Sequence, residues 1–240
     1  MSKLFVTTAT LLLFYQTGFC QSDSTVAYKY FHKGQQEYLL KRYKEAIAYY
    51  DSCIMNNADY KSVYFQRGLA KYHLNELQGS IDDFSIAIEK NKQSTSAYDN
   101  RGFSKMMLGD NTGAMEDFNR SIQINPGNER SFVNRGGLNY KLKLYNEALA
   151  DFNKALLLNP KDIGIFYNVG LSELALKDYK SAIDGFDKFL TAFPDNGSAY
   201  LLRGMAKLNT KDSPGACADF QKALSFGNKD AQETINEFCK

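Results

Sequence analysis

The chain has 240 residues, and its 29 basic and 27 acidic side chains leave a formal net charge of +2. A charge so close to balance gives no indication of nucleic acid as a partner or of binding to an anionic membrane surface. Hydrophobic residues make up 44% of the chain and aromatic residues 14%, which is enough to build a continuous apolar core.

The first twenty residues have the pattern of a secretory signal peptide. Lys3 supplies a positive charge, Leu4–Tyr15 is an apolar run broken only by threonines, and Cys20 ends an acceptable cleavage site before Gln21. The run is too short for a good membrane span. We therefore expect residues 1–20 to be removed, and the mature chain to be periplasmic or extracellular without a membrane span.

Two alternatives remain for this segment. One is an uncleaved N-terminal anchor. The other is a lipid-modified Cys20, but a lipoprotein signal needs a small residue directly before the cysteine, and Phe19 occupies that place. Association with the cell envelope therefore stays open.

After a short polar linker, residues 21–26, the chain repeats one pattern every 34 residues without insertion. Phe132, Gly136, Ala148, Phe152 and Pro160 mark the pattern, and equivalent residues stand 34 positions before and after most of them. A fixed period of this size indicates stacked supersecondary units. The six repeats cover residues 27–60, 61–94, 95–128, 129–162, 163–196 and 197–230.

Each repeat is predicted to form two helices, which in the fourth repeat run over about residues 130–142 and 145–157. Residues suited to a tight turn separate them, as at Asn75, Gly109 and Lys143. Pro126, Pro160 and Pro194 close three repeats, where a helix cannot continue.

The C-terminal end is predicted to carry a capping helix over residues 229–240. Ala231, Ile235 and Phe238 share one face of it, and the end of a helical stack needs such a cover. In the repeat before it, Ser213 is a suitable N-cap ahead of Pro214, and Gly227 ends the helix.

The repeated pattern resembles the tetratricopeptide repeat. That family has an aromatic residue, Gly four residues later, Ala twelve beyond, a second aromatic, another small residue and a closing Pro. The resemblance implies an all-α fold, a right-handed superhelical solenoid of antiparallel helix pairs. It also implies a scaffold for protein–protein contact, although the fold alone does not fix what is bound.

Four repeats carry Arg at the seventh place and Asp at the twenty-third, and the first and fifth repeats lack both. We interpret these residues as partly buried ion pairs that join the two helices of one repeat. An anion site built on the arginines is the alternative, but it does not explain why both residues are lost together. The pairs are Arg67 with Asp83, Arg101 with Asp117, Arg135 with Asp151, and Arg203 with Asp219.

The cysteines point to one candidate disulfide. Cys217 and Cys239 both lie near the C-terminus, and an exported chain permits a bridge between them that would pin the capping helix. Two buried free thiols are the alternative. Cys53 stands where most other repeats carry a small residue, so we expect it to be buried.

No catalytic or cofactor-binding arrangement is recognisable. His32 and His73 belong to no triad or metal-ligand pattern, and no cysteine spacing resembles a zinc site. We therefore expect no enzymatic activity, no metal, no cofactor and no small-molecule substrate.

A ladder of side-chain amides is the candidate binding site. The sixth places of consecutive repeats carry Gln66, Asn100, Asn134 and Asn168, on the stripe that faces the concave side in the family. This resembles the asparagine ladder of the glycosyltransferase and peroxisomal-import members. The alternative is that Asn is common here and the aromatics belong to the core. Apolar residues at the fifth and ninth places would form pockets beside the ladder: Phe65, Leu69, Phe103, Val133, Tyr167, Leu171 and Met205.

Three functions follow as hypotheses. The favoured one is a binding module that holds an extended peptide or a segment of a partner protein in the groove. The others are a structural component of an envelope assembly and an exported chaperone-like holder. A groove that grips C-terminal carboxylates is rejected, because the required cations are absent and the places carry Phe31, Gln35, Gln66, Ser96 and Asn100.

Overall fold

The computed structural model describes residues 25–60 and 62–239. Every regular element in these ranges is an α-helix, and none is a strand, which confirms the all-α prediction. The predicted signal peptide and most of the linker lie outside the described residues. The described chain is already helical at Thr25, two residues before the first repeat was predicted to begin.

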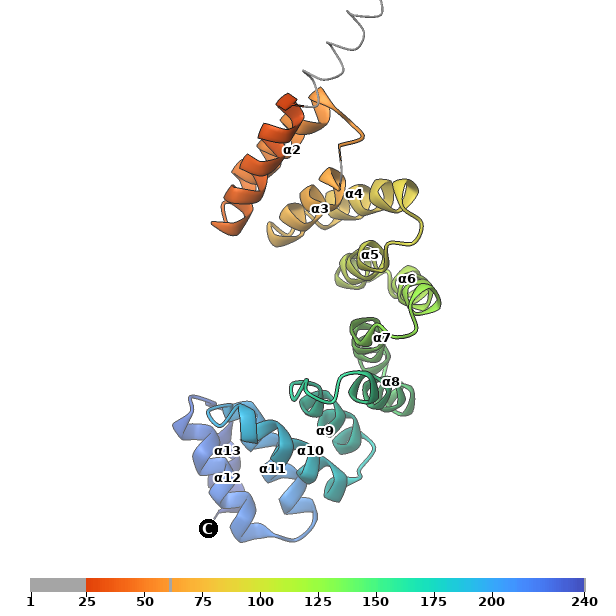
Figure 1. Ribbon diagram of the computed structural model, residues 1–240. Coiled ribbons are helices and arrows are strands. Elements are labelled where there is room, and N and C mark those ends of the chain that lie inside the picture. The colour runs from red at the N-terminus through yellow and green to blue at the C-terminus, as the bar shows by residue number, and fades with distance from the viewer. Residues whose placement is uncertain (1–24, 61, 240) are drawn as a thin grey trace, which may run out of the picture. The chain divides into compact units, whose positions relative to one another are not determined.

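The helices follow one another in pairs, with short turns inside each repeat (Figure 1). The first helix covers residues 25–39. The others are α2 (Tyr43–Asn56), α3 (Val63–His73), α4 (Leu77–Lys90), α5 (Thr95–Leu108), α6 (Asn111–Ile124), α7 (Glu129–Lys141), α8 (Tyr145–Leu158), α9 (Ile165–Ala175), α10 (Tyr179–Ala192), α11 (Gly197–Asn209), α12 (Ser213–Ser225) and α13 (Ala231–Phe238).

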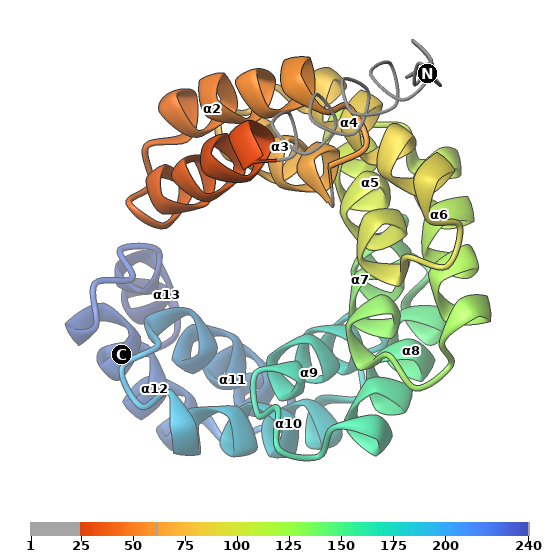
Figure 2. The same cartoon turned by 45° about the horizontal axis from the view of Figure 1, so that its top comes forward.

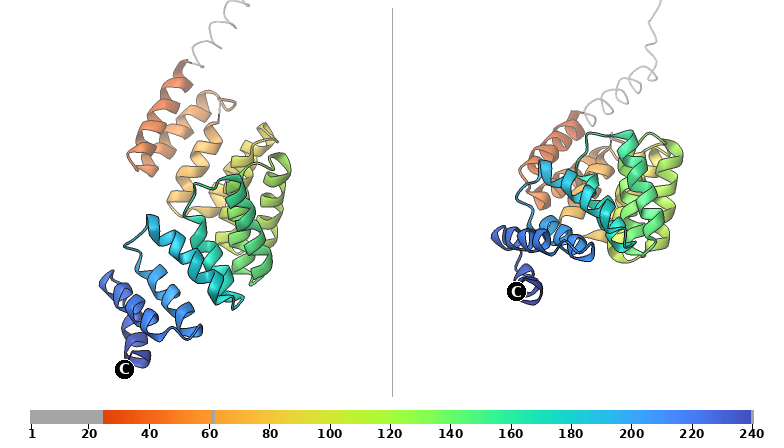
Figure 3. Two further views of the ribbon diagram at one scale, coloured as in Figure 1. Left: turned by 60° about the horizontal axis from the view of Figure 1, so that its bottom comes forward. Right: turned by 90° about the horizontal axis from the view of Figure 1, so that it is seen from below.

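The chain divides into two compact units, residues 1–114 and 115–240, with the boundary inside α6. In the first unit each helix from α2 to α5 packs on the next. In the second the same holds from α7 to α13. Within each unit the first helices of the repeats lie along one face and the second helices along the other, as Figures 2 and 3 show.

The turns inside the repeats use residues with a left-handed backbone. The φ angles are 61° at Asn75, 63° at Lys143 and 89° at Gly109. This conformation reverses the chain in very few residues and suits Gly109 and Asn75, whereas Lys143 adopts it without such a preference. The equivalent turns of the other repeats use Lys41, Lys177 and Lys211.

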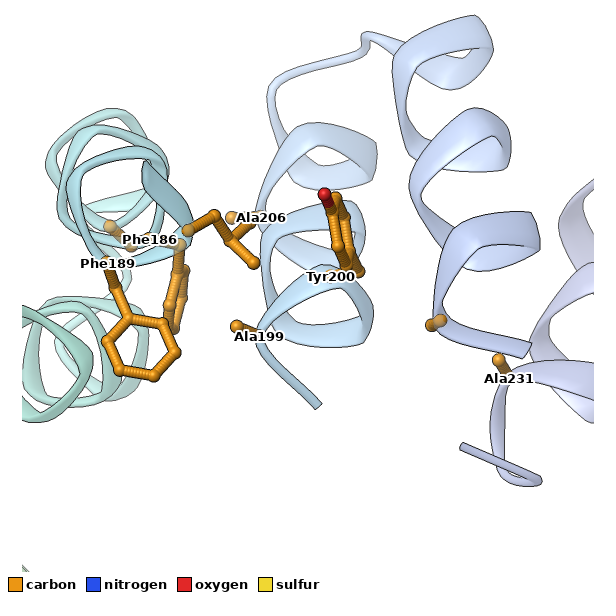
Figure 4. Packing of buried hydrophobic residues seen from close by; sticks show 9 residues of the cluster. Phe186, Phe189, Ala199, Tyr200, Ala206 and Ala231 are labelled. Carbon is orange, nitrogen blue, oxygen red and sulfur yellow. The ribbon is translucent and has the colours of Figure 1, made fainter. Parts of the chain in front are cut away.

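Glycine and a ring set the distance between the paired helices. The rings of Phe84, Phe152 and Phe220 are buried on second helices. Each lies against a glycine sixteen residues earlier, on the first helix, and a Cβ on that glycine would come within 3.0 Å of the ring. The recurring Gly and the recurring aromatic residue are therefore the two partners of one contact between the paired helices. In the second unit this core continues to α11, where Ala199 and Ala206 leave room for Phe186 and Phe189 (Figure 4).

Two details of the C-terminal end differ from the sequence prediction. Asp212, not Ser213, caps α12, because its carboxylate accepts the backbone N–H of Gly215 at 3.0 Å and Ser213 is already helical. On α13, Ala231 is buried as predicted, but Phe238 is 44% exposed. The cap thus covers the stack mainly through its first turn, since Phe238 is the last residue of the helix.

Candidate functional site

The predicted ladder amides lie on the first helices of their repeats. Asn134 precedes Gly136 by two residues, which corresponds to about 200° of helical rotation. Because Gly136 contacts the ring of Phe152 on α8, Asn134 lies on the far side of α7 from α8. Asn168 stands in the same relation to Gly170, which contacts Phe186 on α10. All four ladder side chains are half-buried: Gln66 on α3, Asn100 on α5, Asn134 on α7 and Asn168 on α9.

The four ladder residues are divided between the two units. Gln66 and Asn100 belong to the first unit, and Asn134 and Asn168 belong to the second. The amide of Asn100 already donates to the backbone oxygen of Ser96 at 2.7 Å, which orients this side chain along its own helix.

The apolar residues beside the ladder serve the core as well as the surface. The ring of Tyr167 lies 5.0 Å from that of Phe189, and the ring of Phe65 lies 5.5 Å from that of Phe84. Leu171 packs against the same core as Tyr167, and Val133 packs against that of α8. Part of the alternative interpretation therefore holds: these rings belong to the core. Leu69 and Phe103 are likewise half-buried, whereas Met205 is 43% exposed.

A cavity of about 440 Å³ opens beside Phe65 in the first unit. Its wall is mixed, with the ring of Tyr64 and the ammonium of Lys90 near small serine hydroxyls. The Lys90 ammonium lies 5.5 Å from the centre of the Tyr64 ring and is paired with Asp59.

Three of the four predicted ion pairs lie within one unit, and each of these three is formed. Arg67 forms two parallel hydrogen bonds to Asp83, with Nε to Oδ2 at 2.8 Å and Nη2 to Oδ1 at 2.5 Å. Arg135 holds Asp151 in the same way at 2.9 and 2.6 Å. Arg203 repeats the arrangement with Asp219 at 2.8 and 2.6 Å. Arg101 belongs to the first unit and Asp117 to the second.

Each arginine also reaches the preceding repeat, a contact that the sequence reasoning missed. Its Nη1 donates to a residue sixteen positions earlier, on the second helix of that repeat. The acceptors are Asp51 for Arg67 at 2.6 Å, Ser85 for Arg101 at 3.1 Å, Asn119 for Arg135 at 2.7 Å and Asp187 for Arg203 at 2.5 Å. The available signal was a polar residue sixteen positions on either side of each arginine.

These contacts leave little capacity for an anion. Burial lowers the pKa of Arg67, but its hydrogen bonds to Asp83 and Asp51 outweigh burial and hold the pKa above its ordinary value. Lys71 adds a second cation to Asp83 at 2.8 Å. The guanidinium is thus directed at carboxylates on both sides, which favours a structural role over the anion site.

A disulfide joins Cys217 on α12 to Cys239, directly after α13, with 5.7 Å between the Cα atoms. α13 packs on α12, so the bridge closes the capping helix onto the sixth repeat. Cys53 is a buried free thiol, and burial raises its pKa to about 11, which makes it a poor nucleophile.

Both histidines are exposed, and both contact tyrosines. His73 stacks on Tyr43 at 4.6 Å between ring centres, and its Nε2 lies 2.9 Å from the hydroxyl of Tyr38. His32 lies 4.3 Å from Tyr28. Across residues 25–60 and 62–239, no group of three or more His, Cys, Asp or Glu side chains could hold a metal ion. None of the helices described there has both the length and the hydropathy to cross a bilayer.

Comparison with known proteins identifies the repeat. Two family models, each described as a tetratricopeptide repeat, match residues 129–162 and 167–231. No curated protein sequence matches the chain.

Solved structures share the fold. A chain of the APC/C hetero-tetramer Cut9–Hcn1 has a TM-score of 0.76 and 17% identity over 89% of this chain, which spans 43% of that longer one. Pseudomonas aeruginosa pilF has a TM-score of 0.76 and 16% identity, covering 90% of this chain and 99% of its own. YrrB, described as a TPR protein with an unusual peptide-binding site, has a TM-score of 0.65 and 18% identity, covering 78% and 97%. The shared architecture is a helical repeat solenoid.

Proposed function

The chain is a tetratricopeptide repeat protein, and on that premise we propose that it captures an extended segment of a partner protein on the face formed by its first helices. Repeats of this family serve in general as non-enzymatic scaffolds for protein–protein contact. The proposal adds to that general role a location and a class of ligand.

The half-buried amides carry the proposal. Gln66 and Asn100 in the first unit, and Asn134 and Asn168 in the second, stand at one place of four consecutive repeats. A primary amide offers both a donor and an acceptor, so it can pair with both backbone groups of an extended peptide. Recognition of this kind makes little demand on the partner's sequence.

The apolar neighbours supply the second component of binding. Phe65 borders the cavity of the first unit, and Met205 presents a flexible, exposed side chain in the second. Partly buried rings and an adaptable methionine suit the side chains of a bound segment.

The similar structures support this proposal at the level of the fold. YrrB is described as having a peptide-binding site, and Cut9–Hcn1 is a hetero-tetramer. Both share the helical repeat fold of this chain.

The test is a triple substitution, Asn100→Ala, Asn134→Ala and Asn168→Ala. A partner is first isolated by affinity purification with crosslinking, and its dissociation constant is then measured. Because Asn134 and Asn168 face away from the helix partner and the amide of Asn100 donates within its own helix, the triple variant should weaken capture at least about tenfold and leave the melting temperature nearly unchanged. Capture equal to wild type would place the contact elsewhere.

A second candidate function rests on the other face. Met55 on α2 and Leu157 on α8 are 79% and 76% exposed. These two side chains lie one in each unit, and each is a candidate contact if the chain is a structural component of an assembly. Met55→Ser with Leu157→Ser should then abolish assembly, while the triple asparagine variant should not.

We also propose that the chain is exported. The apolar run Leu4–Tyr15 behind Lys3 supports this, and so does the Cys217–Cys239 disulfide, since such bonds persist in oxidising compartments. Fractionation and mass measurement of the native chain test it. An intact N-terminus on a cytosolic protein would contradict it.

A further inference from the structure

The fifth repeat lacks the ion pair that joins the two helices in the fourth and sixth. Val169 stands at the place of the arginine and Gly185 at the place of the aspartate. A Cβ on Gly185 would lie only 3.2 Å from the Cα of Gly170. α9 and α10 therefore meet almost backbone to backbone, with no space for a charged pair.

A carboxyl group is enclosed in this contact. Glu173 occupies the place where the second and sixth repeats carry Lys71 and Lys207, each of which pairs with its repeat's aspartate at 2.8 Å. Its Oε2 is sealed from solvent and makes no hydrogen bond to any residue that the structure describes. A buried charge without a partner costs free energy, so the packed helix pair favours the protonated carboxyl.

The charges around Glu173 act in the same direction. Burial is the largest influence, Asp178 at the start of α10 and Asp184 on α10 add to it, and together they raise the pKa of Glu173 to about 7. Lys188 opposes them, but its ammonium is already 2.6 Å from Asp184. In the described chain, Asp178, Asp184 and Lys188 are the charged groups that shift the pKa of Glu173, and all three belong to α10 or to the residue that precedes it.

We propose that the fifth repeat is a pH-responsive joint, in which Glu173 is protonated while α9 is packed on α10 and its ionisation loosens that contact. In the unfolded chain an ordinary glutamate ionises with a pKa near 4.5. The stabilisation is thus fully present below that pH and is lost as the pH rises from there to about 7. Above neutrality, the closed helix pair carries an uncompensated charge.

The pH-responsive joint would also affect the proposed capture of a partner segment, because α9 belongs to both. This helix also carries Tyr167, Asn168 and Leu171, so the consequence for a ligand rests on the proposed function. Loosening α9 would disturb that part of the binding face, and capture would weaken as the pH rises from about 4.5 to about 7.

Hydrogen exchange on the full chain without any partner tests the joint. Exchange is followed by mass spectrometry at about pH 5.5 and pH 8.5, corrected for the chemical exchange rate, with α11 and α12 as the internal reference. In the wild-type chain, the equilibrium constant for opening α9 and α10 should rise about tenfold at the higher pH. This factor is smaller than the full pKa shift would give, because Glu173 is partly exposed to solvent.

Matched variants identify the carboxyl responsible. Glu173→Gln should hold α9 and α10 equally protected at both pH values, because the amide cannot ionise. Glu37→Gln should behave as wild type: Glu37 stands at the same place of the first repeat, but it is paired with Arg42 at 3.2 Å.

Two results would overturn the joint. One is a wild-type pH dependence retained in Glu173→Gln. The other is a carboxyl NMR titration of Glu173 in the wild-type chain at an ordinary glutamate pKa, which decides the matter even if the variant fails to fold. Neither measurement involves a partner, so the proposed capture of a partner segment is not affected by either outcome.

Discussion

At the scale of single residues, Arg67, Arg135 and Arg203 each form contacts with more than one helix. Arg135 places its guanidinium between Asp151 of its own repeat and Asn119 of the preceding one. One residue thus holds two helices of a repeat and two neighbouring repeats. That double role explains why a planar, five-donor group recurs here where a lysine would make fewer fixed contacts.

Arg135→Ala should destabilise the chain by roughly 1–3 kcal/mol, because it removes the cation paired with the buried carboxylate of Asp151 and leaves that carboxylate to the amide of Asn139 at 3.1 Å. Thermal and denaturant unfolding measure this. Arg42→Ala is the control: its pair with Glu37 is on the surface, with the arginine side chain 59% exposed, so its loss should be barely detectable. A melt of Arg135→Ala equal to wild type would contradict the structural role, and partner capture should be unaffected in both variants.

Two adjacent glycines on α7 should respond in opposite ways to the same substitution. A Cβ on Gly136 would lie 2.8 Å from the ring of Phe152, whereas a Cβ on Gly137 meets nothing within 4 Å. Gly136→Ala should therefore separate α7 from α8 and lower the melting temperature. Gly137→Ala should stabilise by about 0.5–1 kcal/mol, because alanine loses less backbone entropy in a helix.

The paired melts of these two variants provide their own control, since the chemical change is identical. If both substitutions shifted stability in the same direction, the packing distance between α7 and α8 would not be set by Gly136.

At the scale of elements, the capping helix depends on its covalent link. α13 has only eight residues, too few to be stable alone, and only Ala231 is buried on it. Closing the loop between Cys217 and Cys239, 22 residues apart, should stabilise the chain by about 3 kcal/mol in the loop-entropy model.

Reduction of the bridge, or Cys217→Ser with Cys239→Ser, should release α13 and lower the melting temperature. Hydrogen exchange of α13 and a thermal melt report the two effects. The double variant should not respond further to reductant, because Cys53 is already a free thiol. Both thiols found free in native protein by mass spectrometry would contradict the bridge.

At the scale of the whole molecule, the charges nearly cancel, with a formal net charge of +2. The proposed binding residues are all uncharged, and the arginines are engaged within the repeats. Long-range electrostatic attraction should therefore contribute little to the association with a partner.

Partner capture should accordingly change less than about twofold between about 0.05 and 0.3 M salt. Titration of the purified partner at both salt concentrations measures this. A fall of tenfold or more would show that ion pairs, not amides and apolar contacts, dominate the interface.

The sequence by itself determined the features that depend on local period. A 34-residue repeat with an apolar face on each helix could only form stacked pairs, because each pair must bury that face against its neighbours. The turn residues, the Arg–Asp pair within one repeat and a cap after residue 228 could be predicted in the same way. The turns and the Arg–Asp pair recur at a constant spacing that the repeats display several times, whereas the cap follows from the apolar face that the last repeat would leave open.

The tertiary structure alone decided the features that depend on how neighbouring helices pack against each other. The contact of Arg67 with Asp51 depends on the stacking angle between repeats, and a polar residue sixteen positions before an arginine is compatible with this contact but does not specify it. The same holds for the difference between Gly136 and Gly137, and for the enclosed carboxyl of Glu173. Spacing along a helix assigns a residue to a face, but the distance across an interface is set by the side chains on both sides, and only their packing shows which groups are left without a partner.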